Sequence, residues 1–419
     1  MPVADVMRKV VGPETPIAVS AYDGSHAGPA VASSHLRVND FRALRYMATA
    51  PGQLGMARAY VSGHLDLDGD PYTTLALLAG DDVAALSWRE RWAVLRGLGL
   101  GVMAPLAPPP EEVRAGLWGL RHSPWRDARA VSHHYDVSNR FYRWILGPSM
   151  AYTCAVFGDD ATTLEEAQEE KVDLVCRKLD LRAGQRLLDV GCGWGTMVIH
   201  AARHYGARVL GVTLSAQQAD WARAGIERAG LGGQAEVRHG DYRSVGEDGF
   251  DAVSSIGLTE HIGARHLAGY ARFLAAKLRP RGRLLNHCIT RPMTSEAVRR
   301  PSGFINRYVF PDGEVEAVGT IVSAIHDAGL EVRHSENLRE HYARTCAAWS
   351  ANLEDRWDEA VAEVGSGRAR VWRMYLAGSR LGFVQRRVEL HQVLAVRTHQ
   401  GEAGMPARPD FSRPVALHT

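Results

Sequence analysis

The sequence predicts an α/β fold built on a parallel sheet, and two observations carry this prediction. From residue 186 onward, short apolar runs alternate with segments of helical hydrophobic spacing, which is the pattern of β-α-β units. The first run, 186–190, is followed by Gly191, Gly193 and Gly195, and this spacing indicates a tight turn from a buried strand into a helix. Ligands bind at the carboxyl ends of strands in such a sheet, so the turn is a candidate ligand site.

Two shorter patterns precede the turn. Ser138 is placed to cap a short helix, and an extended aromatic stretch follows over 150–157. Thr162 and Glu165 have the spacing of a capping box, which would begin a helix that continues to Leu179.

The elements expected after the turn follow in chain order. We expect strands over 186–190, 208–212, 235–238, 250–256 and 283–289, and helices over 196–204, 215–229 and 264–278. Pro280 and Gly282 supply the stop signal of the last helix. The elements expected beyond them are an irregular insertion over 291–317, a helix over 318–328, a strand over 330–335, helical segments within 342–381 and a last strand near 388–396.

At 419 residues the chain is long for a single hydrophobic core, so we expect two domains. Residues 1–103 are interpreted as a mostly helical accessory domain with some extended pieces, for lipid contact or dimer formation, and a Pro-rich linker follows over 104–130. The catalytic domain is expected over 131–400, with a loose polar tail over 401–419. The accessory segments with the clearest helical spacing are 41–47 and 88–98.

Alternating aspartates in the accessory domain resemble the start of a calcium-binding loop. These are Asp66, Asp68 and Asp70. Pro71 stands where such a loop needs its turn glycine, and Leu77 stands where it needs a bidentate glutamate. We therefore expect no metal site.

The composition excludes several classes of protein. A net charge of +2 gives no electrostatic case for nucleic-acid binding. Five cysteines without a C-x-x-C pair fit a reducing cytosol better than a disulfide framework or a zinc site. No stretch has the ~20 apolar residues of a membrane span. If the substrate is a lipid, we expect a cytoplasmic protein that contacts the inner face of the membrane peripherally.

The glycine turn resembles the S-adenosylmethionine (SAM) loop of Rossmann-like methyltransferases, because Asp189 begins an Asp-x-Gly-x-Gly-x-Gly pattern rather than the dinucleotide fingerprint. Six motifs in one order extend the resemblance to the cyclopropane-fatty-acid synthase family, which includes mycolic acid cyclopropane synthases and fatty-acyl methyl- and methylene-transferases. The resemblance covers about residues 130 to 397 and implies a Rossmann-like sheet with helical lid insertions. The motifs are His134-Tyr135-Asp136, Tyr152-Thr153-Cys154, Asp189 to Gly195, Thr213-Leu214-Ser215 with Gln218, Glu260-His261, and His287 with Ile289.

The resemblance implies an unusual methyl transfer. The nucleophile is a cis double bond in an unsaturated phospholipid acyl chain, which takes the SAM methyl group and leaves a carbocation that loses a proton. The resemblance also implies a bound bicarbonate as the base. Cys154 and Ile289 would offer it backbone groups, His287 and Tyr342 would donate to it, and Glu260 would orient it.

The resemblance likewise implies a set of SAM-binding residues. They are Tyr152, Thr153, Asp189, Gly191, Gly193, Gly195, Thr213, Gln218, Asp241 and Tyr242. The tyrosine and threonine before the sheet would close over the methionine end, and the glycines would approach it with their backbone. Thr213 and Gln218 would lie near the ribose, while Asp241 and Tyr242 would suit the adenine.

Two products are open, a cyclopropane ring or an exocyclic methylene group. Many cyclopropane synthases have an aromatic residue before the Glu-His pair, where this chain has Leu258 and Thr259. Residues 53–63 look closer to actinobacterial enzymes that make 10-methylene chains, so we favour the methylene and expect a partner reductase. Two other readings remain, a SAM-dependent methyltransferase for a small amine and a non-catalytic lipid-binding relative. A homodimer would provide two membrane contacts at once.

Overall fold

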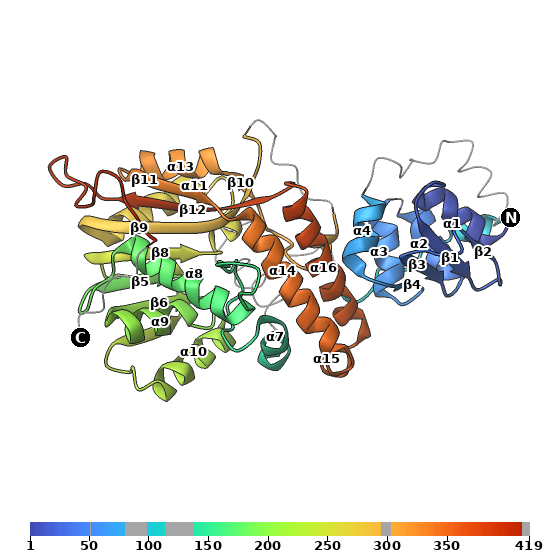
Figure 1. Ribbon diagram of the computed structural model, residues 1–419, viewed down its shortest axis with the longest axis horizontal. Coiled ribbons are helices and arrows are strands. Elements are labelled where there is room, and N and C mark those ends of the chain that lie inside the picture. The colour runs from blue at the N-terminus through green and yellow to red at the C-terminus, as the bar shows by residue number, and fades with distance from the viewer. Residues whose placement is uncertain (51, 80–98, 114–137, 295–302, 413–419) are drawn as a thin grey trace. The chain divides into compact units, whose positions relative to one another are not determined.

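The computed structural model describes residues 1–50, 52–79, 99–113, 138–294 and 303–412 (Figure 1). Its contacts divide the chain into two compact units. The first unit combines Met1–Gly116 with Pro301–Pro311 and Leu353–Leu381, two segments from the region that the sequence assigns to the catalytic domain. The second unit contains the remainder of the chain.

The N-terminal part of the first unit contains a four-stranded sheet in the order β2-β1-β3-β4, whereas the sequence predicted a mostly helical domain with some extended pieces that it did not place. These strands alternate buried and less buried residues, but each spans at most five residues, too few to stand out in the sequence. The helix expected over 41–47 is confirmed, whereas 88–98 lies outside the described residues. The elements are α1(Val3–Val11), β1(Ile17–Ala21), β2(His26–Ala27), β3(Ser34–Val38), α2(Phe41–Thr49), α3(Gln53–Val61), β4(Leu65–Asp68), α4(Pro71–Leu78) and a 3-10 helix over Leu100–Met103.

The alternating aspartates have separate partners within this unit. Asp66 accepts from Asn39 at 2.8 Å and lies 2.6 Å from the Arg370 guanidinium. Asp68 lies 3.3 Å from Arg37, and Asp70 caps α4. Each carboxylate therefore has a structural role of its own.

The Pro-rich stretch after the accessory sheet ends in a buried ion cluster. Glu112 is only 4 % exposed, and its carboxylate accepts from Arg58 at 2.6 and 2.7 Å and from Arg307 at 3.2 Å. The Tyr308 hydroxyl lies 3.3 Å from the same carboxylate. This cluster ties the stretch to α12(Phe304–Tyr308), another part of the first unit.

The second unit is organised by a sheet in the order β11-β12-β9-β8-β5-β6-β7, with β10 beside β9. Strands β5 to β9 are mutually parallel, and β12 runs antiparallel between β9 and β11. The carboxyl ends of β5 to β9 therefore meet at one edge. The strands are β5(Arg186–Val190), β6(Arg208–Thr213), β7(Ala235–His239), β8(Phe250–Ile256), β9(Leu278–Arg291), β10(Glu316–Ala317), β11(Glu331–Asn337) and β12(Glu389–Val396).

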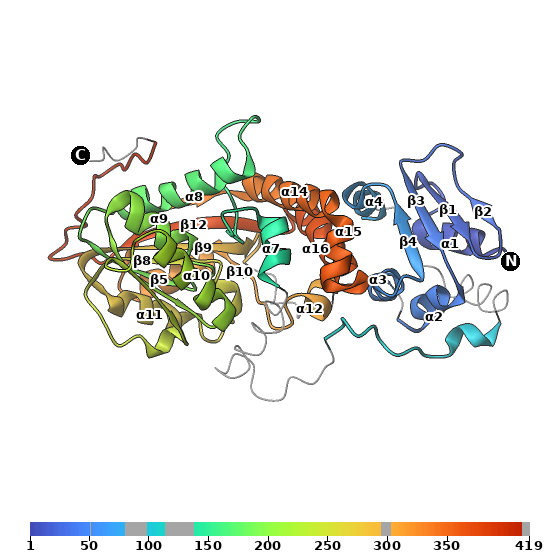
Figure 2. The same cartoon turned by 90° about the horizontal axis from the view of Figure 1, so that it is seen from below.

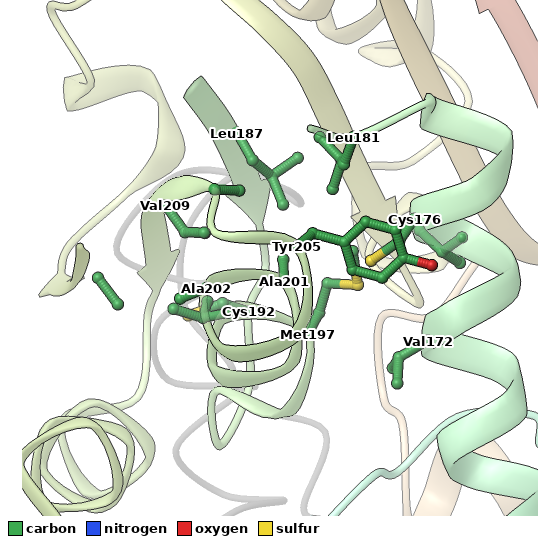
Figure 3. Close-up of a cluster of buried hydrophobic side chains, with 14 of the residues drawn as sticks. Val172, Cys176, Leu181, Leu187, Cys192, Met197, Ala201, Ala202, Tyr205 and Val209 are labelled. Carbon is green, nitrogen blue, oxygen red and sulfur yellow. The ribbon is translucent and has the colours of Figure 1, made fainter. Parts of the chain in front are cut away.

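Helices cover both faces of this sheet. Figure 1 shows α11 and α13 above it and α9 and α10 below it, and Figure 2 has α9 and α10 in front of the strands. Two buried apolar clusters fill the layers, and Figure 3 shows Tyr205 of α9 pointing toward the side of α8 that carries Cys176. The helices of the second unit are α7(Asn139–Leu146), α8(Leu164–Leu179), α9(Thr196–Tyr205), α10(Ala216–Arg228), α11(Leu267–Lys277), α13(Val318–Asp327) and most of α14(Arg339–Asp355). The helix α15(Trp357–Val364) and most of α16(Ser366–Val384) belong to the first unit.

Several predicted boundaries need correction. The capping box is formed by Thr163 and Glu166, one residue later than predicted, because Thr162 bonds Asp159 instead. Strand β9 begins at Leu278, directly after α11, although the helix was expected to reach that residue. The insertion expected to be irregular contains α12 and β10.

The tail expected to be loose packs on the second unit as far as the structure describes it, to Ser412. Met405 and Phe411 contact the apolar cluster between α8 and α9. Arg177 of α8 donates to the Phe411 carbonyl oxygen at 2.9 Å. One aromatic side chain and one backbone hydrogen bond thus fix a segment whose composition is polar and Pro-containing.

Candidate active site

The glycine turn after β5 is held against the neighbouring strands by its backbone. The N–H groups of Gly191 and Cys192 both donate to the Val212 carbonyl oxygen of β6, at 2.9 and 3.0 Å. Gly191 has a φ of 81°, and a Cβ there would lie 3.1 Å from Leu258 Cβ. The turn after β5 therefore lies directly against the segment that follows β8.

Asp189 lies within the sheet beneath this turn. Its carboxylate accepts from the Ser254 hydroxyl at 2.6 Å, so it joins β5 to β8. Burial raises the pKa of Asp189 to about 6, while the Ser254 hydrogen bond and the nearby Lys171 ammonium act in the opposite direction. The structure thus gives Asp189 a role in holding the base of the turn.

The segment with Tyr152 and Thr153 is anchored by two buried polar residues of α8 that the sequence reasoning missed. Gln168 donates to the Thr153 carbonyl oxygen at 2.9 Å, and Lys171 donates to the Thr153 hydroxyl at 3.1 Å. Burial lowers the pKa of Lys171 to about 8. The signal was available, since both residues stand on the apolar stripe of the predicted helix. Thr153 also lies against Gly257, whose Cβ would be 2.9 Å from Thr153 Cγ2.

The other cofactor candidates lie at the ends of β6 and β7. The Thr213 hydroxyl donates to the Gln218 side-chain oxygen at 2.8 Å, and both residues are buried. Asp241 caps a 3-10 helix over Tyr242–Ser244. The Tyr242 ring packs edge-on against the rings of Tyr270 and Phe273, 5.1 and 5.0 Å between centroids. One side of the Tyr242 ring therefore packs against the core.

Aromatic rings connect the glycine turn with α14. Trp194 of the turn lies 4.8 Å from Tyr142, which lies 5.9 Å from Tyr152, measured between ring centroids. Tyr152 lies 5.4 Å from Trp349, which meets Tyr342 at 6.0 Å. Tyr142 is fully buried in this row of rings.

Three of the predicted anion-binding residues converge where β8 and β9 end. The Ile289 N–H donates to Glu260 Oε1 at 2.7 Å, and the Gly257 N–H donates to the His287 carbonyl oxygen at 2.8 Å. Glu260 Oε2 and His287 Nε2 are both buried, and neither has a hydrogen-bond partner among the described residues. Each of the two side chains therefore has one buried polar atom that a small polar ligand or a water can satisfy.

Cys154 and Tyr342 reach the same neighbourhood through Leu338. The Cys154 thiol lies 3.7 Å from the Leu338 carbonyl oxygen, which also accepts from the Tyr342 N–H at 3.1 Å. The Leu338 N–H donates to Leu390, and Leu390 is the β12 partner of Ile289. All five predicted anion-site residues are thus linked within a few contacts of the end of β9.

Comparison with known proteins identifies the family. The family model described as mycolic acid cyclopropane synthetase matches residues 122–393, more than half of the chain. The chain belongs to this family. Solved structures of family members align with this chain over nearly their whole length. The cyclopropane synthase MmaA2 from Mycobacterium tuberculosis aligns with a TM-score of 0.61 and 30% identity, over 66% of this chain and 99% of its own.

Other relatives within the family extend the comparison to the first unit. A probable fatty acid methyltransferase of Mycobacterium tuberculosis is 51% identical over 94% of each chain, and one of Pseudomonas putida is 40% identical over 87% of this chain and 88% of its own. The mycolic acid cyclopropane synthase CmaA1, solved with SAH and CTAB, aligns with a TM-score of 0.61 and 29% identity, over 64% of this chain and 98% of its own. This protein is a SAM-dependent member of the fatty acid methyltransferase and cyclopropane synthase family.

Within the described part of the chain, none of the helices combines the length and hydrophobicity that a membrane span requires.

The raised pKa of the Glu260 carboxyl predicts that turnover depends on pH. Burial raises the pKa of Glu260 to about 7. The hydrogen bond from the Ile289 N–H lowers this pKa, but by less than burial raises it. The free Glu260 oxygen is a full hydrogen-bond acceptor while the carboxyl is ionised, and it loses that capacity as the pH falls through this value. We expect turnover to fall below about pH 7 while the affinity for SAM stays constant, measured at a fixed bicarbonate concentration. A rate that is level from about pH 5.5 to 8 contradicts this role.

Proposed function

We propose that this protein transfers a carbon from SAM to the cis double bond of an unsaturated phospholipid acyl chain, and that bound bicarbonate accepts the proton that the chain loses. The observation that supports this proposal most is that two buried atoms, Glu260 Oε2 and His287 Nε2, have no hydrogen-bond partner among the described residues, Glu260 in the 3-10 helix that follows β8 and His287 on the adjacent parallel strand β9. A buried carboxylate oxygen and a buried imidazole nitrogen each need a polar partner, which a small polar ligand can supply.

Bicarbonate fits these two atoms chemically. Its O–H group can donate to the Glu260 carboxylate, while its anionic oxygens can accept from a ring N–H of His287. Glu260 is itself held by the Ile289 N–H, so its free oxygen has a defined direction. This set contains only one carboxylate and one imidazole, which are too few protein ligands to require a metal ion as the explanation.

SAM supplies an electrophilic methyl group when bound. The residues of this chain fit it at the glycine turn, where a Cβ on Gly193 would meet no atom within 4 Å. The row of rings from Tyr152 to Tyr342 offers π faces, which attract positive charge and suit a carbocation. These rings also keep water from the reacting chain.

We propose an exocyclic methylene at the 10-position as the product, with a cyclopropane as the alternative. The relatives that cover nearly the whole chain are described as probable fatty acid methyltransferases, which supports this choice. Leu258, which replaces an aromatic residue of many cyclopropane synthases, packs against Gly191 at the edge of the site. A smaller side chain there leaves the cation more room to rearrange before it loses its proton.

The test is expression of the chain in a bacterial host fed oleate, followed by mass spectrometry of the derivatised fatty acids. We expect one added CH2 on the oleoyl chain and fragments of an exocyclic methylene at carbon 10. A three-membered ring would overturn the product assignment and retain the family chemistry. No added mass on any lipid would contradict the whole proposal and favour a small-amine substrate.

We further propose peripheral contact with the inner face of the membrane, a reductase that acts on the methylene product, and a homodimer. These proposals follow from the lipid substrate, because the double bond lies inside a bilayer and must reach a site at the edge of the sheet. The accessory sheet of the first unit is the part proposed for lipid or dimer contact.

A further inference from the structure

A row of polar side chains crosses three strands beside the anion site. Glu336 of β11 stands opposite Gln392 of β12, and Gln392 stands opposite His287 of β9. Lys178, near the end of α8, reaches into this row from the helical layer. Lys178, Gln392 and His287 are each at most 1 % exposed, although all three are polar. Buried polar groups are nearly always hydrogen-bonded, so the partners of these side chains show which atom in each contact donates and which accepts.

The pairing begins at a group whose hydrogen-bonding capacity is not ambiguous. The Lys178 ammonium is donor-only, and it bonds the Gln392 side-chain oxygen at 2.6 Å and the Glu336 carboxylate. If the Gln392 amide were turned over, its NH2 group would face the ammonium and two donors would oppose each other. Lys178 therefore fixes the orientation of the Gln392 amide.

The orientation of the amide in turn determines which nitrogen of His287 carries the proton. Gln392 Nε2 lies 3.2 Å from His287 Nδ1 and has only protons to offer. His287 Nδ1 must therefore accept, which leaves the proton of the neutral imidazole on Nε2. Nε2 is the buried atom without a partner among the described residues, so an N–H donor faces the anion site.

We propose that Lys178 and Gln392 are positioning residues that hold His287 as its Nε2–H tautomer, so that this N–H donates a hydrogen bond to an oxygen of the bound anion. The inference rests on the proposed bicarbonate site and deepens it. With the opposite tautomer, His287 would present a lone pair to an anionic oxygen and repel it. Glu336 offsets the charge of Lys178 at the outer end of the row, where it reaches solvent.

The surroundings of His287 favour its neutral form. Burial lowers its pKa well below the usual value, and the nearby ammonium groups of Lys171 and Lys178 act in the same direction. Because His287 stays neutral, Lys178 and Gln392 determine which of its two ring nitrogens carries the proton, and not whether the ring is charged. Partners that orient a functional histidine typically change affinity or activity about 10- to 100-fold when removed.

The first test is the 15N spectrum of protein labelled at histidine nitrogens, with the His287 signals assigned among the 18 histidines by comparison with His287→Gln. We expect an unprotonated Nδ1 and a protonated Nε2 for His287 in the full-length, unmodified protein. A protonated Nδ1 would overturn the proposal. This measurement needs no variant of the row and does not depend on turnover.

Two substitutions of Gln392 then test the cause. Gln392→Glu places an acceptor against Nδ1, so we expect a proton to appear on that nitrogen. Gln392→Met removes the donor, so we expect mixed tautomers, a KM for bicarbonate raised about 10- to 100-fold and an unchanged affinity for SAM. The matched control is His391→Gln, a buried β12 neighbour that bonds Thr290 on the other face, and we expect an unaltered His287 spectrum.

The outcomes separate this inference from the proposed function. An unaltered His287 spectrum in Gln392→Glu, or an unaltered bicarbonate KM in folded Gln392→Met, would overturn the positioning role. A wild-type rate that is independent of bicarbonate would overturn the proposed anion and the donor role of the N–H toward it. In that case the tautomer spectrum would still report whether Lys178 and Gln392 set the proton position.

Discussion

Replacing Glu260 by Gln should nearly abolish turnover and at the same time stabilise the folded protein above pH 7. The Gln side-chain oxygen can still accept from the Ile289 N–H, so the local backbone stays in place. The amide NH2 group of Gln, which takes the place of Oε2, is a donor and can no longer accept a hydrogen bond from the bicarbonate O–H. Loss of a proton-accepting partner typically costs about 10²- to 10⁴-fold in rate. The binding of SAM, measured by calorimetry, should not change.

The stabilisation follows from the raised pKa of the same carboxyl. Because the folded state raises the pKa of Glu260 to about 7, stability falls as the pH rises from the unfolded value toward about 7, and the full cost is present above it. Gln has no charge to bury, so the variant should gain up to about 3 kcal/mol of unfolding free energy at pH 8.

The control is Glu165→Gln. Glu165 is a half-buried glutamate whose pKa is also raised by burial, and whose Oε2 also has no partner among the described residues, but it lies outside the candidate site. We expect wild-type turnover from this variant. Unchanged turnover in Glu260→Gln would contradict the anion-site assignment, and a loss of stability at pH 8 would contradict the burial argument.

Alanine at Gly195 should mainly lower the stability of the fold, whereas alanine at Gly193 should mainly weaken the binding of SAM. Gly195 has a φ of 85°, and a Cβ there would lie 2.8 Å from Ala222 Cβ of α10, so Gly195→Ala should lower the unfolding free energy by about 2 to 4 kcal/mol. Gly193 has a φ of 54° and open space around its missing Cβ, so Gly193→Ala should cost only about 1 kcal/mol.

The affinity for SAM distinguishes the two roles. If the cofactor lies against the turn, the open space beside Gly193 is cofactor space, and Gly193→Ala should raise the Kd for SAM by about tenfold or more. Denaturant unfolding and calorimetry with SAM measure the two quantities separately. Wild-type affinity in Gly193→Ala would argue against the turn as the cofactor site, and wild-type stability in Gly195→Ala would argue against the packing of α9 on α10.

The parallel half of the large sheet was predictable because its signals are local. The strands β5, β6 and β8 are apolar runs bounded by glycines or charged residues, and the predicted ranges differ from the observed ones by a residue at most. The motifs after these strands could be placed at one edge for the same reason, since parallel strands end together. The site candidates Glu260 and His287 were implied by the family resemblance, and the adjacent parallel strands β8 and β9 explain why they lie in one region of the sheet.

The polar row beside the site could not be predicted, because its pairings are not local. Gln392 lies 105 residues from His287 and 214 residues from Lys178 along the chain. Their meeting depends on the register of an antiparallel strand, and a shift of one residue would turn Gln392 to the opposite face. Composition adds no signal, because a buried lysine and a buried glutamine in isolation look like surface residues.

The antiparallel strand β12 also has a consequence for synthesis on the ribosome. It is the last strand of the described part of the chain, yet it lies between β9 and β11, which are made earlier. Until residues beyond Arg387 emerge, β9 has an unpaired edge and His287 has no Gln392 beside it. We therefore expect the nascent chain to lack the complete site, and to be most prone to wrong strand pairing, until β12 has emerged. Carboxyl-terminal truncations should be lost as aggregates rather than accumulate as partly active enzyme.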